Sequence, residues 1–210
     1  MARARAATLA LLVAGLAPAF GLCSERAQLV EALALREGMR VADVGAGDGE
    51  WSEWLAEEVG SEGHVYATEI DAAHVERIER RARQGGLGNI TAVLGQETDT
   101  ALSDGCCDAI LLRMVYHHLT RPAAMRASLW RALRPGGRVV VIDLPPRRDW
   151  RVLPGVPDRG GHGIRMGDLV EEMTSDGFEV VARYEDWNGT GDRYAVVFRR
   201  AASAARGGAR

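Results

Sequence analysis

The chain of 210 residues contains no lysine, so all 26 basic side chains are arginine. Cysteine is scarce, and two of the three cysteines, Cys106 and Cys107, are adjacent. Neither a C-x-x-C nor an H-x₃-H spacing occurs, so we expect no metal site. A Gly-Lys-Ser/Thr sequence is also missing, which excludes a P-loop. The net charge of -3 provides no basic surface for nucleic acid, so we expect no nucleic-acid partner.

The remaining composition is typical of a globular domain, with 47% hydrophobic and 26% charged residues. The length fits one domain, which we place at residues 25–200, followed by a disordered tail at 201–210. We interpret Cys106 and Cys107 as small apolar residues that enter a strand, rather than as a redox or soft-metal pair.

Residues 1–24 differ from the rest of the chain. Arg3 and Arg5 precede an apolar stretch, and Ala17-Pro18-Ala19 is a small-x-small pattern, as in a secretory signal peptide. This pattern predicts a periplasmic or exported protein, with membrane contact only through this segment if it stays uncleaved. Two alternatives remain open. One is a lipoprotein that is modified at Cys23, although the large Leu22 before it disfavours this. The other is an N-terminal extension that results from a poorly chosen start codon.

Strand-like apolar runs alternate with helix-like amphipathic segments along the rest of the chain. We expect strands at 40–44, 64–69, 89–94, 107–115, 138–144, 178–187 and 193–199. We expect helices at 25–37, 50–59, 71–84, 120–133 and 164–175. The alternation predicts an α/β fold, a Rossmann-like doubly wound sheet of seven strands. It is mostly parallel, with an antiparallel C-terminal hairpin, and its ligand is expected at the carboxyl ends of the strands.

The first strand runs into a turn with three alternate glycines, Gly45, Gly47 and Gly49, before the next helix. Glycines let the backbone approach a ligand closely, and the amide groups of the helix face the same place. A dinucleotide-binding turn has glycine at the sixth position of its motif, where this chain has Glu50. Carboxylates at Glu50 and Asp48 disfavour a phosphate here. The turn therefore suits a phosphate-free, cationic ligand, and S-adenosylmethionine fits this description.

Four segments resemble motifs of the class I S-adenosylmethionine-dependent methyltransferases, a family that includes ubiquinone-pathway enzymes with a similar core. They are the glycine turn 43–49, the second strand 65–71, the fourth strand 107–112 and the Pro-Gly-Gly turn with its strand, 133–141. The four occur in the expected order and cover roughly residues 38–144. The resemblance implies a Rossmann-like methyltransferase with S-adenosyl-L-methionine as cofactor.

The same resemblance implies a set of cofactor-binding residues: Asp43, Gly45, Ala46, Gly47, Gly49, Glu69, Ile70, Gln96, Glu97 and Arg113. Glu69 is expected to accept hydrogen bonds from the ribose hydroxyls, and Ile70 to pack on the adenine. Asp43 either faces the ammonium group of the cofactor or caps the turn. For the adenine amino group, Gln96 and Glu97 remain alternatives, because many family members have an acidic residue where this chain has Gln96.

The segment after the fourth strand lies beside the transferred methyl group in the family. Tyr116, His117 and His118 are therefore the candidate catalytic bases, although Tyr116 and one histidine would equally suit packing of the next helix. His162, in the glycine-rich loop 145–163, and Trp187 are candidate substrate contacts. Long loops of this kind often act as lids.

We thus expect a methyltransferase with a weak preference for a small molecule or lipid quinone, over protein or RNA, as its acceptor. A cofactor-binding protein without transfer activity is the first alternative, and an NAD-linked oxidoreductase the second. A cofactor that is made in the cytosol favours a cytoplasmic location, against the signal peptide. The acceptor, the use of a base and the oligomeric state stay open.

Overall fold

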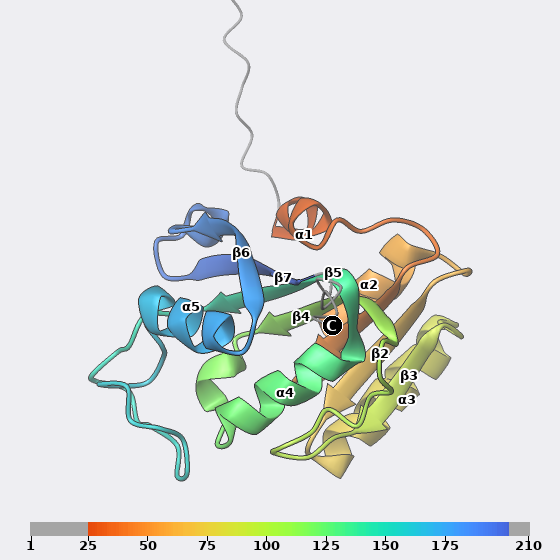
Figure 1. Cartoon of the computed structure of the whole chain (residues 1–210). Helices are drawn as coiled ribbons and strands as arrows, with labels where there is room; N and C mark the ends of the chain where they lie inside the picture. Colours follow the sequence, from red (N-terminus) through yellow and green to blue (C-terminus); the bar gives the residue numbers. More distant parts are fainter. Residues whose placement is uncertain (1–24, 202–210) are drawn as a thin grey trace, which may run out of the picture.

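The computed structural model describes residues 25–201. Seven strands form one sheet in the order β3-β2-β1-β4-β5-β7-β6 (Figure 1). The strands are β1 (Arg40–Val44), β2 (His64–Glu69), β3 (Ile90–Leu94), β4 (Cys107–Arg113), β5 (Leu133–Asp143), β6 (Phe178–Tyr184) and β7 (Tyr194–Arg200). The first five are parallel, and β7 is antiparallel to both β5 and β6. This arrangement confirms the predicted α/β architecture with its antiparallel C-terminal hairpin.

Helices cover both faces of the sheet (Figure 1). They are α1 (Glu25–Leu33), α2 (Glu50–Val59), α3 (Ala72–Gly85), α4 (Pro122–Ala132) and α5 (Met166–Ser175). One core cluster joins α4 and α5 to sheet residues such as Val139 and Val141, and the other joins α1 and α2 to their neighbours Val140 and Ile142. Successive strand residues point to opposite faces, so a continuously apolar strand contributes to both clusters. None of the described helices is long and apolar enough to span a membrane.

Local sequence signals explain where several helices begin and end. The Asp71 carboxylate accepts the Ala73 N–H at 2.8 Å and caps α3, as predicted. Pro122 occupies the first turn of α4, where its missing N–H costs nothing. Helix α1 stops at Leu33 rather than residue 37, because Ala34 takes a left-handed conformation with φ of +53°.

Strand β5 begins earlier than the expected residue 138. Cys107 pairs with Leu133, but Ala109 pairs with Arg138, so the Pro-Gly-Gly sequence is absorbed as an irregularity within the strand rather than as a turn before it. Cys106 and Cys107 are buried, which confirms that they enter β4 as core residues. The cysteine at position 23 and the signal-peptide pattern lie outside the described residues.

The strand order reverses between β1 and β4, whose carboxyl ends meet at one edge of the sheet. Chain segments leave this edge in opposite directions, which opens a crevice where ligands bind in such folds. Directly after β4, Met114 has a φ of +59°, and the chain turns into a short 3₁₀ helix at Tyr116–His118 that was not predicted. A positive φ at a non-glycine residue is strained and is typical of functional sites.

Candidate active site

A cavity of about 340 Å³ lies at the carboxyl ends of β1 and β2 and beside the turn after β4. Its lining combines the glycine turn, the end of β2, the connection after β3 and the loop after β5. The lining residues are Val44, Gly45, Thr68, Glu69, Ile70, Gly95, Gln96, Glu97, Asp99, Thr100, Val115, His118, Leu119, Thr120, Met125, Leu153, Pro154 and Val156. Five of the ten predicted cofactor-binding residues are absent from this lining: Asp43, Ala46, Gly47, Gly49 and Arg113.

Each of the three positions in the turn has glycine for a different structural reason. Gly45 has a φ of +73°, and a Cβ there would lie 2.4 Å from the Val115 side chain, so only glycine fits. Gly47 has a φ of +56°, but nothing lies within 4 Å of its missing Cβ, so it faces open space. Gly49 begins α2, packed on Ile78. The turn therefore presents bare backbone at Gly47, which suits a ligand held close to it.

Glu69 ends β2 and organises this turn. One carboxylate oxygen accepts the Gly47 N–H at 2.8 Å, and the other accepts the Ile70 N–H at 3.0 Å. The Glu69 side chain is only 13% exposed. An ionised carboxylate has about four acceptor sites, so each oxygen can accept one more hydrogen bond. Ile70, beside it on the cavity wall, is 59% exposed and offers an apolar surface.

Asp43 lies beneath the turn and is 2% exposed. Its Oδ2 accepts the Ser52 hydroxyl at 2.6 Å, which ties β1 to α2. Burial raises the pKa of Asp43 to about 6, opposed by the Ser52 hydrogen bond and reinforced by the charge of Glu69. Among residues 25–201, neither Asp43 nor Glu69 forms an ion pair with an arginine. Two adjacent carboxylates with no arginine partner favour a cationic ligand.

Ala46 lies in the glycine turn, and Gln96 and Glu97 lie at the rim of the cavity. The Ala46 N–H donates to the Thr68 carbonyl at 3.1 Å, which holds the turn against β2. Gln96 and Glu97 both line the cavity, and Glu97 accepts the Thr120 hydroxyl at 2.8 Å. The structure therefore brings both alternatives for the adenine contact to the rim and does not choose between them.

The glycine-rich loop after β5 supplies the opposite wall. Leu153, Pro154 and Val156 line the cavity and make this side apolar. The loop is fastened by a bridge between Arg147 and His162, whose backbone groups exchange hydrogen bonds of 2.8 and 3.1 Å. The expectation that this loop covers the ligand site agrees with its position.

Three of the predicted site residues lie away from the cavity. Arg113 forms a two-pronged ion pair with Glu25, at 2.9 and 3.0 Å, and its guanidinium stacks over Trp51. Trp187 is fully buried and donates its indole N–H to the same Glu25 at 3.1 Å. These contacts give Arg113 and Trp187 structural roles in anchoring α1, and the cofactor and substrate contacts expected from the sequence stay predictions.

Tyr116 is also fully buried. Its hydroxyl donates to Glu172 at 2.8 Å and accepts from Arg126 at 3.1 Å. Burial, with the nearby Glu172 charge, raises the pKa of Tyr116 well above its usual range. A tyrosine that holds its proton so strongly does not serve as a base at neutral pH, so the packing alternative describes Tyr116 better than the catalytic one.

The three histidines expected near the substrate do come together. His118 lines the cavity, and the Nε2 of His162 lies 3.0 Å from that of His117 and 3.4 Å from that of His118. Buried Asp143, at the end of β5, holds His117, with 2.6 Å between Oδ1 and Nδ1. The sequence analysis missed Asp143. A single acidic residue at the end of an apolar strand, on the edge of the sheet where ligands bind, was a signal that could have identified it.

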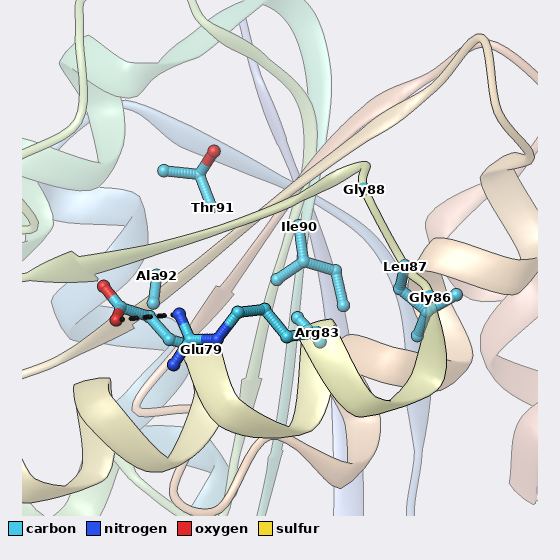
Figure 2. A pocket seen from close by; sticks show the side chains of 9 residues that line it. Glu79, Arg83, Gly86, Leu87, Gly88, Ile90, Thr91 and Ala92 are labelled. Carbon is cyan, nitrogen blue, oxygen red and sulfur yellow. Dashed lines mark ion pairs between the residues drawn. The ribbon is translucent and has the colours of Figure 1, made fainter.

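A second hollow, of about 560 Å³, lies between the end of α3 and the edge strand β3 (Figure 2). It is larger than the cavity, but Glu79 and Arg83 pair with each other across its rim at 3.5 Å. Its strand residues begin at the amino end of β3, away from the carboxyl ends where ligands bind in this fold. We therefore place the functional site at the smaller cavity.

Comparison with known proteins agrees with this fold. Residues 41–137 match the family model described as a methyltransferase domain. A structure described as a SAM dependent methyltransferase from Aquifex aeolicus superposes with a TM-score of 0.70 at 23% identity, covering 85% of this chain and 91% of that one. The [4+2]-cyclase SpnF gives a TM-score of 0.68 at 17% identity, covering 84% and 80%. At these identities the structural likeness shows the fold alone.

Curated relatives match over the same core. The C-methyltransferase UbiE of ubiquinone and menaquinone biosynthesis from Idiomarina loihiensis is 27% identical over 115 residues, covering 54% of this chain and 46% of its own. A protein-L-isoaspartate O-methyltransferase from Methanothrix thermoacetophila is 34% identical, covering 55% and 52%. The chain spans about half the length of these relatives.

The sheet order and the glycine-turn cavity define a Rossmann-like methyltransferase fold. The methyltransferase domain model matches residues 41–137, which are 97 of the 210 residues, and this match agrees with the class I S-adenosylmethionine-dependent methyltransferase family that the sequence resemblance implied.

Proposed function

We propose that this protein binds S-adenosyl-L-methionine and transfers its methyl group to a small, largely apolar acceptor. The observation that carries the proposal is the Glu69 carboxylate, oriented by the Gly47 and Ile70 amides at the edge of the cavity. The side chains around it fit such a cofactor. Glu69 has acceptor sites left for two hydroxyls, Ile70 offers an apolar face, and the space above Gly47 is open.

When bound, the cofactor supplies a methyl group on a positively charged sulfur. The chain then has to hold the acceptor in line with that methyl group and keep water away. The apolar wall formed by Val115, Leu119, Leu153 and Val156 suits both tasks. His118, on the same wall, is uncharged at pH 7, because burial and the neighbouring histidines lower its pKa to about 4.

The acceptor class rests on the cavity wall and on the relatives. An apolar wall favours a flat or aliphatic small molecule over a protein side chain, and the name of the UbiE relative refers to quinones. We therefore propose a quinone-like acceptor as the first class to test. Incubation with cofactor labelled in its methyl group and a panel of demethylated quinones, phenols and thiols would identify the product by mass spectrometry.

Glu69→Ala tests cofactor binding directly. Loss of charge-assisted hydrogen bonds to the ribose should weaken binding of S-adenosylhomocysteine by about 10- to 100-fold in calorimetry. Glu79→Ala, an exposed glutamate on α3, is the control and should bind as the wild type does. Equal binding by both variants would overturn the assigned site. Tight binding without turnover on any acceptor would instead favour a cofactor-binding protein that lacks transfer activity.

A further inference from the structure

His117, His118 and His162 form a cluster whose donor atoms all lie within 4.8 Å of one another. We propose that these three side chains bind one divalent transition-metal ion of the zinc type. The cluster comes from two segments, the 3₁₀ helix after β4 and the loop after β5, so no short sequence spacing reveals it. The inference does not depend on methyl transfer, because metal binding is measured without cofactor.

The distances suit such an ion. Zinc–nitrogen bonds of ~2.0–2.1 Å in a tetrahedral site place two nitrogen ligands about 3.3 Å apart. The Nε2 atom of His162 lies 3.0 Å from that of His117 and 3.4 Å from that of His118. The described residues supply three metal-ligand atoms to this cluster, one ring nitrogen from each histidine. Three protein ligands with one open position are typical of catalytic rather than structural zinc sites.

The proton positions also favour a cation between the rings. The Nδ1 of His162 lies 3.0 Å from the Arg151 carbonyl oxygen, which can only accept, so that nitrogen carries the proton and Nε2 is bare. The Nδ1 of His117 lies 2.6 Å from Asp143, too close for a bare nitrogen, although its N–H is not well aligned. With its proton on the Nδ1 that faces Asp143, His117 has Nε2 left as a lone-pair donor as well.

Two bare nitrogens 3.0 Å apart repel each other unless a cation lies between them. A shared proton, balanced by Asp143, is the alternative, but it would satisfy only two of the three imidazoles. A metal ion uses all three lone pairs at once. The Asp143 and Arg151 contacts on the far sides of two rings are the outer contacts by which proteins orient metal-binding histidines.

The backbone holds His162 in place for this role. Gly161 and Gly163 have φ of +139° and +125°, and a Cβ on either would lie 2.7 Å from a carbonyl oxygen, that of Arg147 or Leu144. Side chains at these two positions would push the loop off the end of β5. Asp143 is fixed in turn, since its two oxygens accept the main-chain N–H groups of Leu144 and His117 at 2.7 and 3.1 Å. Close packing at the two glycines and hydrogen bonds to Asp143 therefore fix the backbone around the histidine cluster.

The position of the ion follows from His118, which lines the cavity. An ion held by the cluster therefore lies at the cavity wall, where its open position is left for water or for an oxygen or sulfur atom of a bound molecule. The metal would then be a further point of attachment inside the proposed methyl-transfer site.

Metal titration of the untagged full-length chain tests the inference. After removal of metal with a chelator, we expect calorimetry to show one Zn²⁺ bound per chain, and Co²⁺ to give the visible absorption of a tetrahedral site. His162→Gln, in the loop, should lower Zn²⁺ affinity about 100-fold or more and abolish that absorption. Asp143→Asn should lower affinity by about 10- to 100-fold, as loss of an outer partner does.

His64→Gln is the matched control, because His64 lies at the amino end of β2 and contacts Thr91 instead. It should bind both ions as the wild type does. Circular dichroism and S-adenosylhomocysteine binding establish that each variant is folded. The inference is overturned if the wild type binds neither ion, or if folded His162→Gln binds as tightly as His64→Gln. If the wild type binds metal but not S-adenosylhomocysteine, the metal site stands and the proposed function fails.

Discussion

Gly47 is the residue at which the cofactor proposal is most sharply testable. Gly47→Val combines a left-handed backbone with a branched side chain, at a cost of about 1–2 kcal/mol, and fills the open space above the turn. We expect S-adenosylhomocysteine affinity to fall about 100-fold, equivalent to ~2.7 kcal/mol, in calorimetry. Gly105→Val is the control, since Gly105 has a φ of +62° and is equally uncrowded but precedes the amino end of β4, away from the glycine turn. If both variants lose affinity equally, strain alone explains the loss.

Asp43 makes a prediction of pH dependence. Its pKa in the folded protein is about 6, above the usual ~3.9, so between pH 4 and 6 the folded protein keeps a proton that the unfolded chain has lost. The free energy of unfolding should therefore fall as pH rises through this window. Asp43→Asn should remove the fall and stabilise the protein by about 1–3 kcal/mol at pH 7 but not at pH 3.5.

Ligand binding should respond to the same substitution with the opposite sign. If Asp43 supports a cationic ligand, Asp43→Asn weakens S-adenosylhomocysteine binding while it raises the melting temperature. Thermal melts across pH, with and without ligand, measure both effects. A variant that is stabilised and binds normally would leave Asp43 as a cap of the turn only, through Ser52.

At the scale of elements, a partly buried ion pair helps to anchor α1. Arg113 and Glu25 are 22% and 14% exposed, so the loss of either partner leaves a poorly solvated charge. Arg113→Leu should lower the free energy of unfolding by about 1–3 kcal/mol in denaturant titration. Adding Glu25→Gln should recover part of the loss, because it removes the orphaned charge.

The same variants decide whether Arg113 has any cofactor role. Arg113→Leu should leave S-adenosylhomocysteine affinity unchanged, because Arg113 does not line the cavity. A tenfold loss of affinity without a loss of stability would restore the cofactor contact that the sequence resemblance implied.

Elements were the easiest level to predict from the sequence, for local reasons. Asp71, Pro122 and the glycines mark helix ends by chemistry that acts within a few residues. The Rossmann-like sheet followed from the alternation of elements, and the glycine turn with Glu69 followed from motif order. The start of β5 was placed too late because its pairing with β4 absorbs an irregularity that only the partner strand reveals.

Side-chain destinations were harder because they depend on distant parts of the chain. Arg113 meets Glu25, 88 positions away, and Trp187 meets the same carboxylate across 162 positions. Tyr116 faces the core because the strained Met114 rotates the following turn. No local pattern contains these contacts, so the sequence motifs could not predict the tertiary partners of these side chains.

At the scale of the whole molecule, the compartment remains a proposal. We propose that residues 1–24 act as a signal peptide, on the basis of the arginines, the apolar stretch and Ala17-Pro18-Ala19. Intact-mass measurement of the chain expressed with its native leader should then find a product that begins at Phe20. A product that keeps Met1 or Ala2 would contradict export and remove the conflict with a cytosolic cofactor.

The glycine-flanked His162 has a consequence for finding related proteins. Because neither neighbouring position accepts a side chain, Gly-His-Gly after the fifth strand is a strict requirement, and His-His after the fourth strand is its complement. We expect any chain of this fold that has both Gly-His-Gly and His-His at these places to form the same cluster of three histidines, even where the rest of its sequence differs. A sequence search for the two short patterns together would therefore identify a subgroup of this fold. Its members would share the histidine cluster, whereas the glycine turn would be common to all members of the fold.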